Sequence, residues 1–225
     1  MATVALVGST GLVGSHILSI LVPHSSISSI FAYTRRELPS NSPKLNPLSS
    51  TDTLTWVSLF PKSPVPNIFF SALGTTKAQA GSVANQRKID LDLNLDLAKA
   101  AREAGVETYV LISTAGANSG SRIPYSQMKG ELEDKVKEIG FKHTVILRPG
   151  LIGGTRQDSR PTEYVIRALA NGLRKVSPGM VDFWSQDADT IARAAVNAGL
   201  QASEGIKEEG VWVLSQKEIV QLGKE

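Results

Sequence analysis

The sequence predicts an α/β fold, in which a doubly wound parallel sheet carries helices on both of its faces. Two observations lead to this prediction: short apolar runs alternate with stretches of helical periodicity, and the apolar runs are hydrophobic on both faces. The 225 residues are enough for one such domain with a continuous core. We therefore expect a single domain over residues 1–225, with a cofactor half at 1–150 and a short substrate-side extension at 151–225.

Each strand is expected where a short apolar or β-branched run stands between turn-forming residues. These runs lie at residues 3–7, 30–33, 54–57, 67–73, 108–113, 144–147 and 211–214. Each helix is expected where apolar residues recur at helical spacing between capping signals. These stretches lie at residues 11–22, 83–104, 125–139, 162–172 and 188–200, and at the C-terminus. The run at 54–57 is a weak strand, and the Pro, Ser and Asn residues of 37–53 predict a loop with little helix.

The composition argues against several classes of function. Lys and Arg total 24 against 21 Asp and Glu, and no dense basic run occurs, so nucleic acid is not an expected partner. Cysteine is absent and the three histidines are far apart, so we expect no disulfide, no metal site and no Ser-His-Asp triad. No apolar stretch reaches the roughly 20 residues that cross a bilayer, and no basic region precedes the first apolar run as in a secretory signal.

Three glycines, Gly8, Gly11 and Gly14, stand between the first expected strand and the first expected helix. In an α/β sheet this turn directs the free N–H groups of the helix toward the ligand crevice, where they can hold a pyrophosphate. Gly8 permits the tight turn, Gly11 lets the backbone approach the phosphates, and Gly14 lets the helix pack closely on the sheet.

The spacing G-x-x-G-x-x-G differs from the G-x-G-x-x-G of many dinucleotide sites, and no Gly-Lys-Ser/Thr follows as in a P-loop. A tight turn without a ligand is the alternative interpretation. Because the glycines lie at the first strand-to-helix junction, we expect a Rossmann-type dinucleotide site there. Its phosphate-binding residues are expected to be Gly8, Ser9, Thr10, Gly11, Leu12, Val13 and Gly14.

Two arginines, Arg35 and Arg36, follow the second expected strand. An acidic residue about 20 positions after the glycines would bind the ribose 2′-hydroxyl of NAD, and here the arginines take that place. A guanidinium can instead hold a 2′-phosphate by paired, charge-assisted hydrogen bonds. The sequence therefore favours NADP(H) over NAD(H), with two solvated surface arginines as the alternative.

A catalytic set is expected around Tyr125 and Lys129, which lie four residues apart on one helix face, with Ser113 at the end of the preceding strand. Tyr125 would exchange a proton with a carbonyl oxygen, Lys129 would stabilise its phenolate and bind the nicotinamide ribose, and Ser113 would donate to the substrate oxygen. Thr114 is the rival for the role of Ser113. The alternative is a helix with an interfacial tyrosine and a surface lysine.

Together, Ser113 and the Tyr-x-x-x-Lys pair resemble the short-chain dehydrogenase/reductases. The wider sequence is similar to the atypical members of that superfamily, and most to the Tat-interactive oxidoreductase family in its fungal mitochondrial branch. The runs that carry the resemblance are VGSTGLVGSHIL, FFSALGTTKAQAG, KIDLDLNLDLAKAAREAGVETYVLISTAGAN, YSQMKGELEDKV and ILRPGLIGGTRQDSRP.

The resemblance implies a Rossmann-type domain, NADP binding, reductase activity on a carbonyl/alcohol pair and a peripheral position at the mitochondrial outer membrane. It also implies that Pro149 and Gly150 lie beside the nicotinamide, and that residues 156–161 line a substrate mouth or form an ion-paired loop. The residues that it places over the cofactor after the fourth strand are Leu73, Gly74, Thr75 and Thr76.

Three further acidic residues, Asp90, Asp92 and Asp96, lack the additional ligands of a metal site. We expect them on a solvated helix face, with Asp90 near the cofactor. The leading functional hypothesis is an NADPH-dependent carbonyl reductase that acts on a small molecule. The alternative hypothesis is a protein that senses NADPH and binds a protein partner with little or no turnover. A structural protein on a membrane surface is a third possibility.

Overall fold

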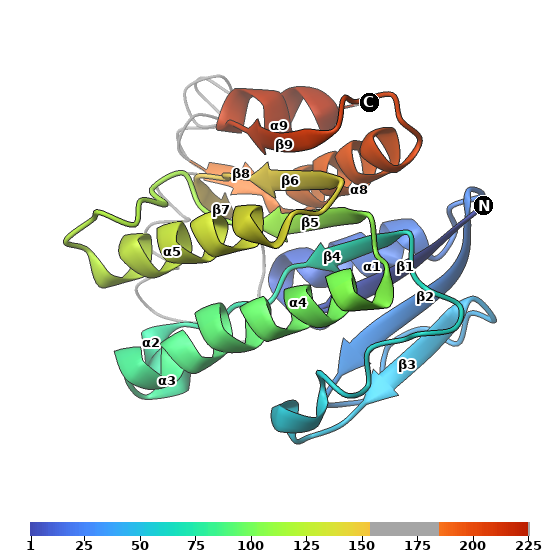
Figure 1. Cartoon of the computed structure of the whole chain (residues 1–225), viewed down its shortest axis with the longest axis horizontal. Coiled ribbons are helices and arrows are strands. Elements are labelled where there is room, and N and C mark those ends of the chain that lie inside the picture. Colours follow the sequence, from blue (N-terminus) through green and yellow to red (C-terminus); the bar gives the residue numbers. More distant parts are fainter. Residues whose placement is uncertain (154–184, 225) are drawn as a thin grey trace.

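The computed structural model describes residues 1–153 and 185–224. A seven-stranded parallel sheet has the order β3-β2-β1-β4-β5-β6-β9 (Figure 1). Two further short strands pair in parallel beside it. The strands of the main sheet are β1 (Ala2–Val7), β2 (Ile27–Thr34), β3 (Leu45–Ser49), β4 (Ile68–Ser71), β5 (Thr108–Ile112), β6 (His143–Leu147) and β9 (Gly210–Leu214); the small sheet contains β7 (Leu151–Gly153) and β8 (Ser185–Asp187). The predicted fold class is confirmed.

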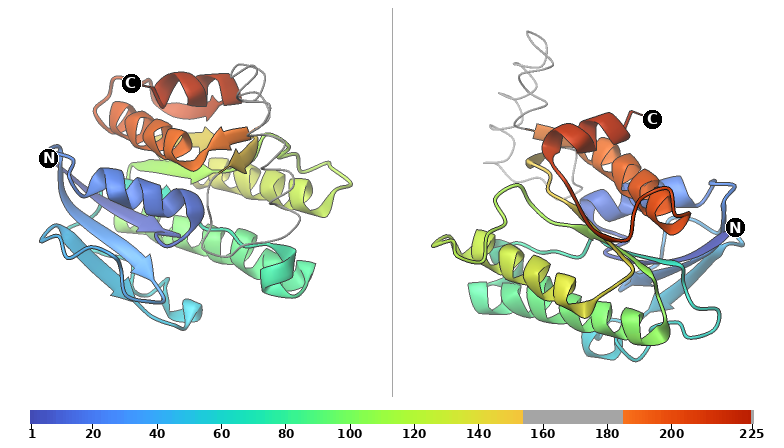
Figure 2. Two further views of the ribbon diagram at one scale, coloured as in Figure 1. Left: turned by 180° about the vertical axis from the view of Figure 1, so that it is seen from behind. Right: turned by 45° about the horizontal axis from the view of Figure 1, so that its top comes forward.

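Helices cover both faces of the main sheet (Figures 1 and 2). One face packs against α1 (Leu12–Leu21), α8 (Ala188–Ser203) and α9 (Gln216–Leu222). The other face packs against α4 (Asn94–Ala104) and α5 (Pro124–Ile139). The remaining helical segments are η1 (Thr53–Thr55), α2 (Lys77–Ala80), α3 (Val83–Arg87) and the π-helical turn η2 (Lys88–Leu93).

The core has two parts because the central strands are buried on both faces, as expected for a parallel sheet. In β4, Ile68 and Phe70 belong to the cluster beneath α1 and α8, and Phe69 belongs to the cluster beneath α4 and α5. Gly199 lets α8 approach the sheet closely, since a Cβ atom there would lie 2.9 Å from the ring of Phe70.

The third strand differs from the prediction. Residues 54–57 form no strand, because η1 ends within them at Thr55. The Trp56 indole is buried and donates to the carbonyl of Ser50 at 3.1 Å. The edge strand β3 lies instead inside the segment that was predicted to be a loop, and it pairs with β2. Pro47 is compatible with this strand because an edge strand leaves one row of N–H groups unpaired.

Two other predicted helices need comment. The single helix expected over 83–104 is divided into α3, the π-helical turn η2 and α4. The helix expected at 162–172 lies outside the described residues. In the described parts of the chain, no helix is long and apolar enough to cross a membrane, and no group of three His, Cys, Asp or Glu residues is arranged to hold a metal.

The carboxyl ends of β1, β4, β5 and β6 lie at one edge of the sheet, because all of its strands are parallel. The chain reverses its direction of strand addition between β1 and β4. Ligands of open α/β sheets bind at such a switch point. Most of the predicted site residues lie in the loops and helices that follow these four strands, whereas Arg35 and Arg36 follow β2.

Candidate active site

The glycine turn is shaped by two close approaches. Gly8 has a φ of +80°, and a Cβ atom there would lie 2.4 Å from the carbonyl oxygen of Ala72. At Gly14 a Cβ atom would lie 2.0 Å from the carbonyl oxygen of Gly8. Both positions therefore require glycine: Gly8 for its backbone conformation and the loop after β4, Gly14 for the packing of α1 on the turn.

The first turn of α1 is suited to an anion. Gly11 is the N-cap of α1, and it contributes no side-chain hydrogen bond to the helix. Its own N–H donates to the carbonyl of Gly8 at 2.8 Å. Because no side chain caps the helix, its first N–H groups are available to a phosphate.

Ser9 holds this turn against β2. Its side chain is buried, and its hydroxyl donates to the carbonyl oxygen of Tyr33 at 2.6 Å. The hydroxyl proton of Ser9 is thus used within the protein.

The arginine pair lies at the surface. Arg35 and Arg36 are both exposed and follow the last residue of β2. The Thr34 hydroxyl donates to the carbonyl of Arg36 and accepts from its N–H, so Thr34 fixes the backbone of this turn. This arrangement is compatible with solvated arginine side chains.

A stripe of three buried polar residues fastens one helical segment to the loop after β4. Asn94 donates to the carbonyl of Leu73 at 3.1 Å, and Gln86 donates to that of Thr75 at 3.1 Å. The N–H of Thr75 donates to Asp90 Oδ1 at 2.6 Å. Gln86, Asp90 and Asn94 have exposed fractions of 6%, 1% and 0%.

Asp90 was predicted to lie near the cofactor, whereas Gln86 and Asn94 were not predicted as site residues. Gln86, Asp90 and Asn94 are spaced four residues apart, and this regular spacing of polar residues was the signal available. Asp90 is also not on a solvated face as expected; it is buried, whereas Asp92 and Asp96 are exposed. It lies on the π-helical turn η2, and such turns are frequent at functional sites.

Tyr125 and Lys129 lie on successive turns of α5. Pro124 starts the helix at a position where its missing N–H costs nothing. Tyr125 is 43% exposed, whereas Lys129 is 3% exposed and donates from Nζ to the carbonyl of Ile112 at 3.1 Å. Burial lowers the pKa of Lys129, and the carboxylates of Asp90 and Glu133 oppose that shift.

Ser113, Glu133 and Arg148 form a polar cluster that joins the ends of β5 and β6 to α5. Glu133 is fully buried, and its Oε1 accepts from the Ser113 hydroxyl at 2.5 Å. The Arg148 guanidinium binds the same carboxylate through Nη2 at 2.5 Å and Nε at 3.1 Å. Since a hydroxyl has one proton, Ser113 in this arrangement donates to Glu133. The neighbouring Thr114 is half-buried.

Glu133 and Arg148 were not predicted as site residues. Glu133 follows Lys129 by four residues on the same face of α5, and Arg148 directly follows β6. These positions were visible in the sequence, but the pairing of the two side chains depends on how α5 packs against the sheet.

Pro149 and Gly150 lie at the same edge. The carbonyl of Pro149 accepts from the N–H of Ala115 at 2.8 Å, which ties the loop after β6 to the loop after β5. A Cβ atom at Gly150 would lie 3.1 Å from the amide nitrogen of Gln216, at the start of α9. The expected substrate-mouth residues 156–161 lie outside the described residues.

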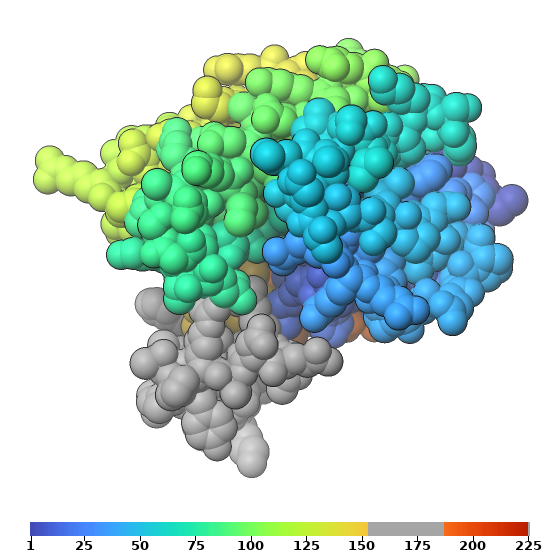
Figure 3. All heavy atoms as spheres, turned by 90° about the horizontal axis from the view of Figure 1, so that it is seen from below, coloured from blue at the N-terminus to red at the C-terminus, as the bar shows by residue number. Residues whose placement is uncertain are grey.

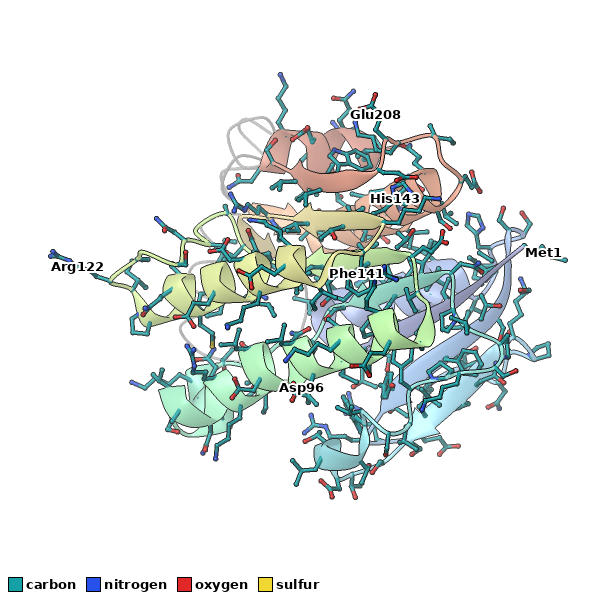
Figure 4. All side chains as sticks on the ribbon, in the orientation of Figure 1. Met1, Asp96, Arg122, Phe141, His143 and Glu208 are labelled. Carbon is teal, nitrogen blue, oxygen red and sulfur yellow. The ribbon has the colours of Figure 1, made fainter. Side chains whose placement is uncertain are left out.

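The loop between β5 and α5 projects from the body of the molecule (Figure 3), and Arg122 lies at its tip (Figure 4). Gly130 lets this loop pack closely against α5, because a Cβ atom there would lie 2.1 Å from the backbone nitrogen of Ser119.

A surface cavity of about 330 Å³ lies elsewhere, at the amino ends of β6 and β9, where it is lined by His143 and Glu208 among others. It contains none of the predicted site residues.

Comparison with solved structures defines the class of fold. MoeE5 in complex with UDP-glucose and NAD has a TM-score of 0.68 at 18% identity, over 98% of this chain and 80% of that one. WbmH of Bordetella bronchiseptica in complex with NAD⁺ has a TM-score of 0.66 at 17% identity, over 95% and 75%. A short chain dehydrogenase family protein from Francisella tularensis has a TM-score of 0.67 at 12% identity, over 97% and 98%. The chain therefore shares the Rossmann-type fold of these proteins.

Comparison of sequences gives the family. The family model HIM1 matches residues 42–176. The chain is 52% identical to "Protein fmp52-1, mitochondrial" of Aspergillus terreus over the whole of both chains. It is 48% identical to "Protein fmp-52, mitochondrial" of Neurospora crassa, over 98% of this chain and 95% of that protein. The chain therefore belongs to the HIM1 family, together with these fmp52 proteins. The resemblance to the Tat-interactive oxidoreductases stays a prediction.

The predicted preference for NADP(H) over NAD(H) is wrong. Among the structures of similar fold, those of MoeE5 and WbmH contain NAD rather than NADP. The prediction depended on Arg35 and Arg36 binding a 2′-phosphate. Their exposed positions on a turn that Thr34 fixes fit the alternative interpretation, in which both are solvated.

Proposed function

We propose that this chain is an NAD-dependent oxidoreductase that interconverts a carbonyl and an alcohol of a small molecule, with Tyr125 as the acid and base. The observation that carries the proposal is the pairing, on α5, of a half-exposed phenol with a buried ammonium one turn away. This pair follows β5 at the sheet edge where β1 leads into the uncapped first turn of α1.

The cofactor would be held by three groups of residues. The backbone of the Gly8–Gly14 turn would bind its diphosphate, and the Leu73–Thr76 loop would cover it. Lys129 would bind the nicotinamide ribose, beside Pro149 and Gly150. When bound, the nicotinamide supplies or accepts the hydride.

In the direction of reduction, Tyr125 donates its phenolic proton to the carbonyl oxygen of the substrate. In the direction of oxidation, the Tyr125 phenolate accepts the hydroxyl proton of the alcohol. This requires the pKa of the Tyr125 phenol to fall from about 10 toward neutrality. A fall of about three units corresponds to about 4 kcal/mol of preferential stabilisation of the phenolate. The Lys129 ammonium contributes to this stabilisation.

A hydroxyl after β5 would stabilise the developing charge on the substrate oxygen. Ser113 was predicted for this role, and it would have to give up its hydrogen bond to Glu133 to donate to a substrate. Thr114, the next residue, has no hydrogen bond to Glu133 to give up. Both residues therefore enter the proposal.

The experiment is a panel of carbonyl compounds assayed by NADH consumption, with Tyr125→Phe as the matched variant. We expect the variant to retain NADH binding, measured by fluorescence, and to lose turnover by about 10²-fold or more. Equal turnover of the variant and the wild type would contradict the role of Tyr125. Binding of NADH with no turnover on any compound would favour the alternative of a cofactor-sensing protein.

We also propose that the protein is mitochondrial, because the fmp52 relatives carry that word in their names. A peripheral position at the outer membrane rests on the family resemblance alone. Fractionation of mitochondria with extraction by sodium carbonate tests both statements: release of the protein from the mitochondrial membrane fraction is expected, and absence from mitochondria would contradict the first.

A further inference from the structure

Asp90 is a buried carboxylate with only neutral hydrogen-bond donors. Thr75 donates its N–H to Oδ1 at 2.6 Å, and Gln86 donates its amide to Oδ2 at 3.4 Å. In the described residues, no ion pair within 4.0 Å joins Asp90 to a cation. A buried charge that lacks a close partner is costly unless a nearby opposite charge compensates it.

Lys129 is a buried cation on α5, the helix that packs against the η2 turn on which Asp90 lies. Its ammonium has three donors, and the hydrogen bond described for it goes to the uncharged carbonyl of Ile112. The burial of Asp90 raises its pKa, and the charge of Lys129 is the largest opposing influence. In turn, the charge of Asp90 raises the pKa of Lys129 against the effect of burial, and it does so more strongly than the charge of Glu133.

The other charged groups around Lys129 are already matched. Glu133, on the same helix, binds the Arg148 guanidinium through three hydrogen bonds, so its negative charge is largely balanced by that cation. Tyr125, one turn earlier on α5, is neutral until it titrates. On η2 the neighbouring Asp92 is exposed and solvated. Asp90 is thus the carboxylate whose charge is left to compensate Lys129.

We propose that Asp90 is a positioning residue whose buried carboxylate keeps the Lys129 ammonium protonated, and so able to stabilise the phenolate of Tyr125. The second half of this inference rests on the proposed function. The hydrogen bonds from Thr75 and Gln86 fix the position of the carboxylate on the π-helical turn. An amide at this position would satisfy the Thr75 N–H equally well but would supply no charge.

The first test measures the charge of Lys129 without substrate or cofactor. In protein labelled with ¹³C-lysine, the Cε resonance of Lys129, assigned with Lys129→Met, is followed through a pH titration. Asp90→Asn keeps the shape of the side chain and should lower the titration midpoint by about one unit or more, a tenfold loss of proton affinity. Asp92→Asn, an exposed change on the same turn, should leave the Lys129 midpoint in place. Asp90→Glu, which keeps the carboxylate charge, should show a midpoint much closer to that of the wild type than Asp90→Asn does.

The second test uses the alcohol-oxidation activity of the same variants. Since a less charged Lys129 stabilises the phenolate less, the rise of kcat with pH should shift to higher pH in Asp90→Asn and stay in place in Asp92→Asn. An unmoved Lys129 midpoint in Asp90→Asn overturns the proposal, as does a moved midpoint with an unmoved kcat profile. Full turnover in Tyr125→Phe would instead overturn the proposed function while leaving the Lys129 titration as a separate result.

Discussion

Gly14 illustrates how the glycine turn depends on single atoms. The carbonyl oxygen of Gly8 occupies the space that a Cβ atom at Gly14 would need, and Gly8 in turn adopts a positive φ. The sequence was sufficient to predict the tight turn at Gly8, because a junction between a strand and a helix imposes it locally. The approach of the Ala72 carbonyl oxygen to Gly8 depends on the pairing of β4 with β1. Gly11 differs, since a Cβ atom there would lie 3.1 Å from the carbonyl oxygen of Gly8 and needs only a small adjustment.

The first prediction concerns Gly14→Ala. A Cβ atom 2.0 Å from the Gly8 oxygen forces α1 away from the turn, so we expect a loss of about 1–3 kcal/mol in the free energy of unfolding and loss of NADH binding. Urea unfolding and NADH fluorescence measure the two effects. Gly120→Ala is the control, because a Cβ atom there meets only the Asn118 side chain at 3.4 Å. Unchanged NADH binding in Gly14→Ala would contradict the assignment of the phosphate site.

The second prediction separates the two hydroxyl residues after β5. Ser113 donates to Glu133, so Ser113→Ala should cost about 1 kcal/mol of stability and reduce kcat modestly. Thr114→Val should reduce kcat by about 10²-fold with little effect on stability, as when a donor to a developing oxyanion is removed. The steady-state rates of the two variants, measured with one carbonyl compound, decide between them. The reverse order would return the substrate-binding role to Ser113.

At the scale of whole elements, α5 organises the site. Its buried face presents Lys129 to the carbonyl of Ile112 and Glu133 to Ser113 and Arg148, so one helix fixes the ends of two strands. The position and the Tyr-x-x-x-Lys pattern of this helix were predicted from the sequence. The pairing of Glu133 with Arg148 was not, because it depends on packing between segments that the local pattern does not specify.

A third prediction tests that pairing. Glu133→Gln leaves the Arg148 guanidinium without its counter-charge, and we expect a loss of about 3 kcal/mol in the free energy of unfolding, measured in urea. Glu131→Gln is the matched control on the same helix. Glu131 pairs with the exposed Arg87, so its change should cost less than about 1 kcal/mol. Equal losses in the two variants would show that burial of the Glu133–Arg148 pair has no special effect.

The fourth prediction concerns the start of α9, where Gln216 lies against Gly150. Hydrogen bonds from Ser215 to the Glu218 carboxylate complete a capping box and lower the pKa of Glu218. Because the folded pKa is below the unfolded value, this stabilisation is present above the unfolded pKa and is lost as the pH falls through the folded one. Glu218→Gln should therefore cost about 0.5–1 kcal/mol at pH 7.

The difference between wild type and Glu218→Gln should vanish at pH values below the folded pKa of Glu218. Urea unfolding of both proteins across the acidic range measures this convergence. A gap that stays constant with pH would show that the carboxylate charge contributes nothing to the cap.

At the scale of the whole molecule, the order of the sheet decides which loops meet. Strands alternating with helices were enough to predict a parallel sheet, but not that β4 and β5, which are buried on both faces, would lie near its centre. The edge was mispredicted, because β3 contains Pro47 and few apolar residues and is stabilised by pairing with β2 rather than by its own pattern. A similar limit applies to η2: its π-helical turn departs from the 3.6-residue period of an α-helix, so Asp90 was assigned to a solvated face.

The most direct test of the central claim is a crystal structure of the protein with bound NAD. We predict that the diphosphate contacts the backbone of the Gly8–Gly14 turn, that Lys129 lies within hydrogen-bond distance of the nicotinamide ribose, and that the Tyr125 hydroxyl faces C4 of the nicotinamide ring. A diphosphate bound away from that turn, or a nicotinamide ring remote from Tyr125 and Lys129, would contradict it.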